Sequence, residues 1–181
     1  MKILFRLGIL TLTLIAHTGQ SQILMAEKSF IKFYSDGIIE DITATNAKGS
    51  ALLDMATGDI AFDIPINRFE FAKDLMKQHF NEKYMESEKF PKSTFTGKLI
   101  GFNSTKPGSQ EVVAQGKLAI HGVTQEVSIP GTIEIQNASK ATLKSKFMVK
   151  LVDYKIKIPT VVWQNIAEQV EVTVEFAMKP K

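Results

Sequence analysis

The sequence predicts a mainly β protein: an antiparallel β-barrel of about eight to ten strands with one amphipathic α-helix, at about 68–84, packed on or closing the barrel. Short segments of alternating apolar and polar residues follow one another at regular intervals, which is typical of strands with one buried face. Only one segment shows helical periodicity instead. Strands of this kind need closure to avoid exposed edges, and about 160 residues follow the N-terminal segment. One sheet closed on itself is therefore favoured over a sandwich.

The N-terminal segment has the features of a secretory signal peptide. Two basic residues precede an apolar run at 7–16, and a small-x-small cleavage site ends at Ser21. A run of this length is too short to span a bilayer comfortably, which makes an uncleaved membrane anchor the less favoured alternative. The sequence predicts a signal peptide at 1–21 and one domain at 22–181, periplasmic or secreted after cleavage.

Composition argues against several functional classes. The chain has no cysteine, which excludes disulfides and thiol chemistry. Without the signal peptide, 20 basic residues stand against 19 acidic ones, so the mature protein is close to neutral. No basic block interleaved with aromatic residues remains, and nucleic-acid binding is therefore not expected.

Four strands are expected before the helix. They are Phe30–Ser35, Ile38–Thr45, Lys48–Asp54 and Asp59–Ile66. The pair Asp36-Gly37 is a signal for a two-residue hairpin between the first two strands, and Thr57-Gly58 predicts a turn between the last two. Pro65 lacks an N–H, so the strand ladder is expected to be open or to end there.

The helix is predicted from a stripe of apolar residues spaced four apart. The stripe consists of Ala72, Met76, Phe80 and Tyr84. Asn67 and Glu70 stand in the spacing of a capping box, which would satisfy backbone N–H groups of the first turn. Pro91 keeps the residue before it extended, so the helix must end earlier. An amphipathic helix among strands has to bury its stripe, and we expect it to pack on the sheet or to plug it.

After the helix the period changes from helical to alternating. The expected strands are Thr94–Phe102, Val112–Ile120, Val123–Ile135, Leu143–Leu151, Lys155–Ile158 and Val170–Met178. Polar loops and glycine-containing turns separate most of them. With the earlier strands they make a set large enough to close a barrel.

The inward faces of these strands and the helix stripe are predicted to enclose an elongated apolar pocket. A barrel of roughly eight strands is wide enough to hold one small or elongated apolar ligand. The residues expected to line the pocket are Phe62, Ile64, Met76, Phe80, Phe95, Leu99, Leu118, Ile120, Phe147 and Val149. Gly97, Gly101 and Gly116 lie on the same faces, where they either leave room for a ligand or allow the barrel to curve. The alternative is a solid-packed barrel without a ligand, a secreted structural or stress-related interaction module.

The sequence nominates no catalytic residue. The mature chain has two histidines, His79 and His121, and it lacks the nucleophile-elbow, P-loop and dinucleotide-binding motifs. His79 and Glu82 stand three apart on the predicted helix, but no third strong metal ligand lies nearby. A binding or structural protein is therefore expected rather than an enzyme, with no metal and no catalytic cofactor.

Two stretches resemble the signature motifs of the YceI-like family. The first is Phe90-Pro91-Lys92-Ser93-Thr94-Phe95. The second contains Leu118, Ile120, Gly122, Val123, Thr124 and Val127. Many members also carry an Arg-Asp-x-His-Leu run near the helix, where this chain has Lys73-Asp74-Leu75-Met76, and the stretch 155–163 is typical of a distinct branch.

The resemblance covers essentially the whole mature chain. It implies a secreted or periplasmic, lipocalin-like barrel whose apolar interior takes a polyisoprenoid or similar amphiphilic lipid, such as a quinone. The partner would then be that lipid, with transient membrane contact and no nucleic acid. Because the motif near the helix differs, no head-group contact is carried over from the family.

Overall fold

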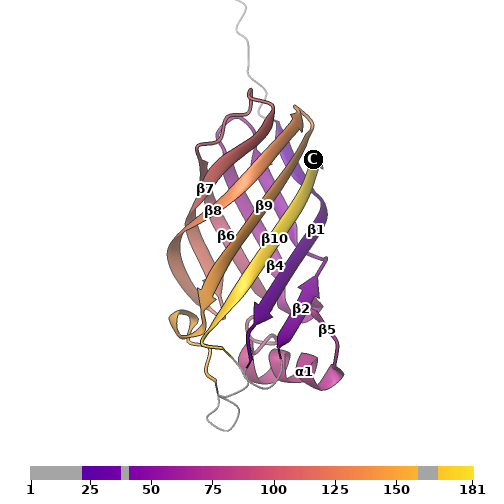
Figure 1. Cartoon of the computed structure of the whole chain (residues 1–181), viewed down its shortest axis with the longest axis vertical. Helices are drawn as coiled ribbons and strands as arrows, with labels where there is room; N and C mark the ends of the chain where they lie inside the picture. Colours follow the sequence, from indigo (N-terminus) through magenta and orange to yellow (C-terminus); the bar gives the residue numbers. More distant parts are fainter. Residues whose placement is uncertain (1–21, 38–40, 159–166) are drawn as a thin grey trace, which may run out of the picture.

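The computed structural model describes residues 22–37, 41–158 and 167–181, which form a closed antiparallel barrel (Figure 1). Its strands are β1 (Ile23–Ser35), β2 (Ile42–Asn46), β3 (Ser50–Asp54), β4 (Asp59–Pro65), β5 (Glu70–Phe71), β6 (Lys92–Ile100), β7 (Gly108–Ile120), β8 (Val123–Asn137), β9 (Lys140–Lys150) and β10 (Gln169–Pro180). Eight of them make the barrel in the order β10-β9-β8-β7-β6-β4-β3-β1, and β1 pairs with β10 to close it. The short strands β2 and β5 extend the sheet beyond β1. The predicted fold class is confirmed.

β1 closes the barrel by pairing with β10, and its other edge pairs with two different strands. One edge pairs with β10, from Leu24 opposite Pro180 to Tyr34 opposite Glu171. The other edge pairs with β3 near the start of β1 and with β2 near its end. The sheet therefore branches at β1, and β2 and β5 reach toward α1 (Asp74–His79), the one α-helix among the described residues (Figure 1).

The two ends of the barrel differ in how they are filled. At one end, which we call the packed end, buried apolar side chains occupy the interior: Leu24, Leu53, Met55, Ile60, Ile133, Ile135, Ala141 and Met178. At the opposite end, which we call the α1 end, α1 lies across the barrel (Figure 1). The 3-10 helix η3 (Leu151–Tyr154) follows β9 at this same end. In the described part of the chain, no helix is long and apolar enough to cross a membrane.

The helix starts later than the sequence predicts. The predicted first turn is instead β5, which pairs with Ala44 and Thr45 of β2. The capping box is wrong, because Asn67 lies in a 3-10 turn and the N-cap of α1 is Lys73, without a side-chain capping bond. Strand pairing and burial of neighbouring aromatic rings outweigh the local capping preference here. α1 then continues into a π-helical turn, Phe80–Tyr84.

Two other local predictions need correction. The connection from β1 to β2 spans 36–41, because Ser35 pairs with Ile42, so the two-residue hairpin at Asp36-Gly37 is wrong. The predicted strand start at 38–40 and Trp163 lie outside the described residues. The segment Lys155–Ile158 is not a strand; it follows η3 as a turn in which Lys155 has a φ of 56°.

Candidate functional site

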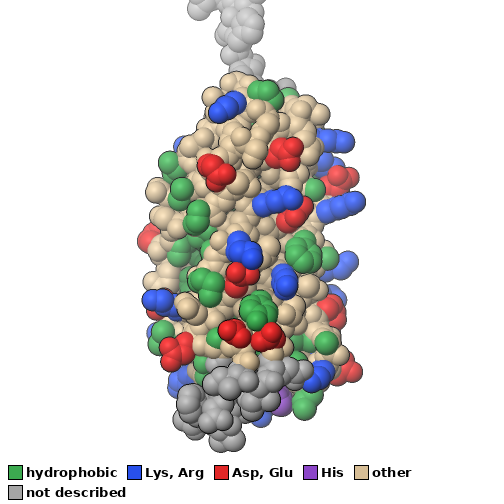
Figure 2. Space-filling model, viewed as in Figure 1, with side chains coloured by type: hydrophobic (Ala, Val, Ile, Leu, Met, Phe, Trp, Pro, Cys, Tyr) green, Lys and Arg blue, Asp and Glu red, His purple; other side chains and the backbone are tan. Residues whose placement is uncertain are grey.

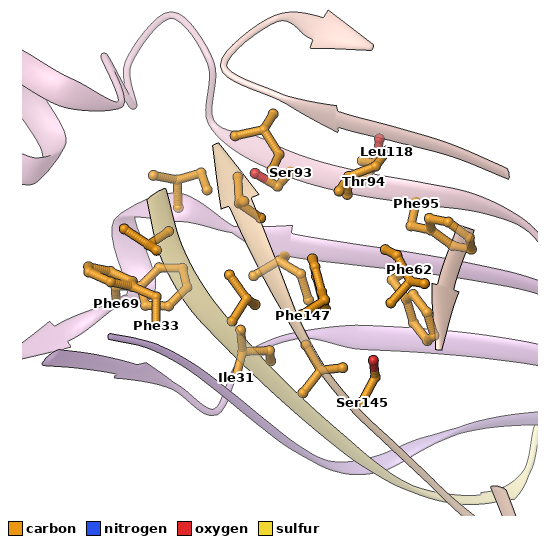
Figure 3. Close-up of a pocket in the computed structure, with 18 of the residues that line it drawn as sticks. Ile31, Phe33, Phe62, Phe69, Ser93, Thr94, Phe95, Leu118, Ser145 and Phe147 are labelled. Carbon is orange, nitrogen blue, oxygen red and sulfur yellow. The ribbon is translucent and has the colours of Figure 1, made fainter. Parts of the chain in front are cut away.

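A cavity of about 370 Å³ lies inside the barrel. It extends from the level of Phe62 and Phe176 to the α1 end, where Met76 and Tyr84 contribute to its wall. Figure 3 shows side chains from several strands converging on this space. The walls are mainly aliphatic and aromatic, as is typical of pockets for apolar ligands.

All ten residues that the sequence nominates lie on the cavity wall. Strand alternation places most of them, since every second residue of a barrel strand points inward. Phe95 and Leu99 come from β6, for example, and Phe147 and Val149 from β9. Their contact with a ligand remains a prediction.

Several wall residues were not nominated from the sequence. Ile31 and Phe33 of β1 and the valines of β10 alternate as clearly as the nominated residues, so their pattern was sufficient to find them. Phe69, Phe71 and Met85 could not be found in this way, because they lie in segments that are too short to show an alternating pattern.

Four phenylalanines form an aromatic cluster at the α1 end. The cluster consists of Phe33, Phe69, Phe71 and Phe80. The ring of Phe80 stacks on Phe33 with centroids 5.3 Å apart and lies 5.0 Å from Phe71. Aromatic pairs of this kind add about 0.5–1.5 kcal/mol each beyond simple burial. The cluster therefore holds β1, β5 and the π-helical turn together beside the cavity.

A second aromatic group lies between the cavity and the packed end. Phe62 stacks on Phe176 with centroids 4.8 Å apart and lies 5.8 Å from Phe95. These rings come from β4, β10 and β6, and they meet across the barrel interior. They form the floor of the cavity.

Few polar side chains face the cavity. Ser145 donates to the carbonyl of Pro130 at 2.6 Å, and Ser35 accepts from the N–H of Ala167 at 3.1 Å. Apart from Lys144, the remaining polar side chains of the wall are His79, Tyr84, Ser93 and Thr94. Burial raises the pKa of Tyr84 above its ordinary value of 10.0, so its hydroxyl is neutral at physiological pH.

No described aspartate, glutamate or arginine lines the cavity. Lys144 contacts it, but its side chain is 56% exposed and its ammonium lies 3.4 Å from Glu175 on the outside of the barrel, where basic and acidic side chains lie side by side (Figure 2). The interior is therefore an apolar space with hydroxyl and imidazole groups and without a fixed charge. Such a space favours an uncharged apolar chain, because an unpaired charge there would be costly to desolvate.

The glycines of β6 and β7 allow the two strands to approach closely and do not enlarge the cavity. Gly97 and Gly116 face each other in the ladder, and neither lines the cavity. A Cβ on either residue would collide with the backbone of the facing strand. Of the two interpretations of these glycines, close strand approach and curvature fit the structure, and space for a ligand does not. Gly101, with a φ of 86°, lies in the turn after β6.

The candidate metal pair does not gain a third ligand. His79 lies on the cavity wall, whereas Glu82 is exposed and accepts from Gln78 at 3.1 Å. Among the described residues, no group of three His, Cys, Asp or Glu side chains is arranged to hold a metal ion.

The fold and the site define a closed eight-stranded antiparallel barrel with an apolar cavity, a class wide enough to hold one small ligand. The chain belongs to the YceI-like domain family, whose model matches residues 23–178. This match confirms the resemblance seen in the two sequence motifs.

Solved structures show the same fold at low sequence identity. A polyisoprenoid binding domain from Saccharophagus degradans, described as implicated in plant cell wall breakdown, is 15% identical with a TM-score of 0.76, over 90% of this chain and 100% of that one. Burkholderia cenocepacia BcnA is 18% identical with a TM-score of 0.67, over 82% and 95%. The Campylobacter jejuni YCEI protein is 15% identical with a TM-score of 0.54, over 100% and 94%. A comparison with curated proteins gives no match.

Proposed function

We propose that this barrel binds a polyisoprenoid or similar amphiphilic lipid in its cavity. The observation that carries the proposal is the continuous apolar space between the Phe62–Phe176 floor and the α1 end, with no described acidic or arginine side chain on its wall. Burying an apolar chain there would contribute about 25 cal/mol per Å² of surface removed from water. The structural similarity to a polyisoprenoid binding domain supports the same ligand class.

The polar side chains favour one orientation of the lipid. Tyr84 and His79 belong to α1 and its π-helical continuation, and Ser93 lies at the start of β6, near the same end. The floor of the cavity is aromatic. A polar head group is therefore best placed at the α1 end, with the apolar tail directed toward the floor.

The proposal is for binding and not for catalysis. A pair of acid and base groups is the usual requirement for hydrolytic or proton-transfer chemistry. Of the described wall residues, His79 is the one with an imidazole, and no carboxylate accompanies it on the wall. This supports a protein that holds its ligand unchanged.

The test is lipid capture by a protein whose cavity has been filled. Ala114 lies on the wall, so Ala114→Trp should occupy the space and abolish binding of a long-chain prenyl lipid in native mass spectrometry. Ala119 is on the same strand, outside the set of wall residues, and Ala119→Trp is the matched control that should keep binding. Equal capture by both variants, or none by the parent protein, would overturn the proposal in favour of a ligand-free interaction module.

We also propose that the domain acts outside the cytoplasm, after removal of residues 1–21, and that it meets membranes only transiently to exchange its lipid. The basic, apolar and small-residue pattern of that segment supports export. N-terminal sequencing of exported protein should read from Gln22. A sequence that still began at Met1 would contradict this proposal.

A further inference from the structure

Three strained backbone positions meet at one junction at the α1 end. Among the described residues, the non-glycine positions with positive φ are Glu86 at 42°, His121 at 51° and Lys155 at 56°. They belong to the loop after the π-helical turn, the turn between β7 and β8, and the residue after η3. Left-handed backbone is costly for such residues, and it persists where surrounding contacts enforce it.

The side chain of His121 connects the three segments. Its Nε2 lies 2.8 Å from Oε2 of Glu86, and its Nδ1 lies 3.2 Å from the carbonyl oxygen of Tyr154. The imidazole is only 10% exposed, whereas Glu86 is 45% exposed. Phe90 packs edge-on against the imidazole at 4.6 Å, in a position that a Cβ on Gly122 would block.

Both hydrogen-bond partners of His121 are acceptors. A neutral imidazole has one N–H and can satisfy one of them, while an imidazolium donates from both nitrogens. With Glu86 ionised, both contacts are satisfied as hydrogen bonds only by the protonated ring, which would also pair with the carboxylate as an ion pair.

Both segments that His121 connects contribute residues to the cavity wall. Met85 immediately precedes Glu86 and lines the cavity, and Tyr84 lies just before it. Leu151 and Ile156 stand on either side of Tyr154 and also line the cavity. His121 thus joins two separate segments of the wall at the α1 end.

We propose that His121 is a positioning residue that fixes the α1 end of the cavity wall in its protonated form and releases the carbonyl of Tyr154 when it loses a proton. The consequence for lipid exchange rests on the proposed function, whereas the release itself does not. As the pH rises through the titration of His121, one donor is lost. The carboxylate of Glu86, at 2.8 Å, is the stronger acceptor and keeps the remaining N–H, so a ring lone pair faces the carbonyl of Tyr154 at 3.2 Å. The segment that carries Leu151 and Ile156 then loosens.

The other charged groups at the junction do not replace this contact. The loop also carries Glu88 and Lys89, and the ammonium of Lys89 lies 4.8 Å from the ring centre of Phe90. Asp153 and Lys155 flank Tyr154, whose own pKa is raised by burial and by Asp153. Of the described side chains, Glu86 is the one that forms an ion pair with His121. Protonation of Glu86 at low pH would end the ion pair as well, so the junction is complete only between the two titrations.

The test measures the pH dependence of hydrogen exchange in the lipid-free protein. The titration of His121 is first located by NMR, with His79 as the other imidazole of the mature chain. Protection of the amides at 151–156, corrected for intrinsic exchange, should fall about tenfold from below to above that titration, as a charge-assisted hydrogen bond is lost. The centre of β8 should not change.

The variant Glu86→Gln shows whether the closed state depends on the protonation of His121 or only on the presence of a hydrogen-bond partner at position 86. A carboxamide can accept from a ring N–H or donate to a ring nitrogen, so this variant should remain closed and lose the pH dependence. Glu88→Gln removes a neighbouring exposed charge and should keep it. Equal protection on both sides of the titration, or an unchanged pH dependence in Glu86→Gln, would overturn the proposal. Because no lipid is present, failure here is distinct from failure of the proposed lipid binding.

Discussion

Phe80 belongs both to the packing of the protein and to the wall of the cavity. Its ring contacts three other phenylalanines of the aromatic cluster, yet the side chain is only half-buried. We expect Phe80→Ala to lower the free energy of unfolding of the lipid-free protein by about 1–3 kcal/mol, less than the 3–5 kcal/mol typical of a ring enclosed by protein. Urea unfolding measures this loss, and lipid affinity should fall in the same variant.

The control for Phe80 is on the same helix. Leu75 is 61% exposed, so Leu75→Ala should change stability by less than about 0.5 kcal/mol. A loss of the larger size in Phe80→Ala with unchanged lipid affinity would make Phe80 a plain core residue.

Tyr84 should report directly on occupation of the cavity. Burial already holds its pKa above 10.0, and a bound lipid would remove more water and raise the pKa further. Tyrosinate absorbance, followed with and without lipid, should show one phenol shifting upward, and Tyr84→Phe should abolish the shift. Tyr34 serves as the comparison, since hydrogen bonding with Asp41 raises its pKa and it is not a wall residue.

The same shift predicts how stability responds to alkaline pH. The pKa of Tyr84 is higher in the folded than in the unfolded protein, so folding favours the protonated phenol. Its contribution is complete below pH 10 and is lost as the pH rises through the folded pKa. Tyr84→Phe should therefore unfold less steeply with pH in the alkaline range, as measured by urea midpoints.

At the scale of elements, the glycine pair between β6 and β7 sets how closely the two strands approach. A Cβ at Gly97 would meet the carbonyl of Gln115, which cannot move without disturbing the ladder. We expect Gly97→Ala to destabilise the protein by about 1–3 kcal/mol or more. Thr96→Ala, at the exposed neighbouring position, should be close to neutral in the same thermal melts. Equal melting temperatures for both would show that the strands can separate at little cost.

Strand alternation predicted more of this protein than helix signals did. A period of two assigns each residue of a strand to one face, so eight of the ten nominated wall residues followed from strand alternation once a barrel was assumed, and Met76 and Phe80 followed from the helix stripe. The capping box at Asn67 and Glu70 failed because residues 70–71 pair with β2, a long-range contact that no local pattern contains. The π-helical turn and the junction at His121 likewise depend on segments far apart in the chain.

At the scale of the molecule, we expect residues 22–181 to fold without the first 21 residues. The carbonyl of Gln22 accepts from Met55 at 3.0 Å, and Ile23 starts the pairing with β3. A chain that begins at Gln22 should therefore unfold in one cooperative transition, as expected of a single small domain. Circular dichroism with a thermal ramp tests this, and a non-cooperative transition would show that the first 21 residues contribute to the fold.

Closure of the barrel was predictable from strand number and exposed edges, but the difference between its ends was not. Which inward residues touch one another across the interior depends on the tilt and register of all eight strands. Leu53 and Ile133, for instance, follow the same alternation as the wall residues, yet they pack into the filled end.

Because buried side chains fill the packed end, the cavity is closed at that end and does not run through the barrel. A chain-like guest would have to go in tail first and come out head first, retracing its own path. The site that supplies the guest molecule and the site that receives it would then both have to meet the same end of the barrel. They could not be bound at opposite ends. Such a protein could ferry single molecules between sites, but it could not serve as a stationary conduit through which a stream of them passes.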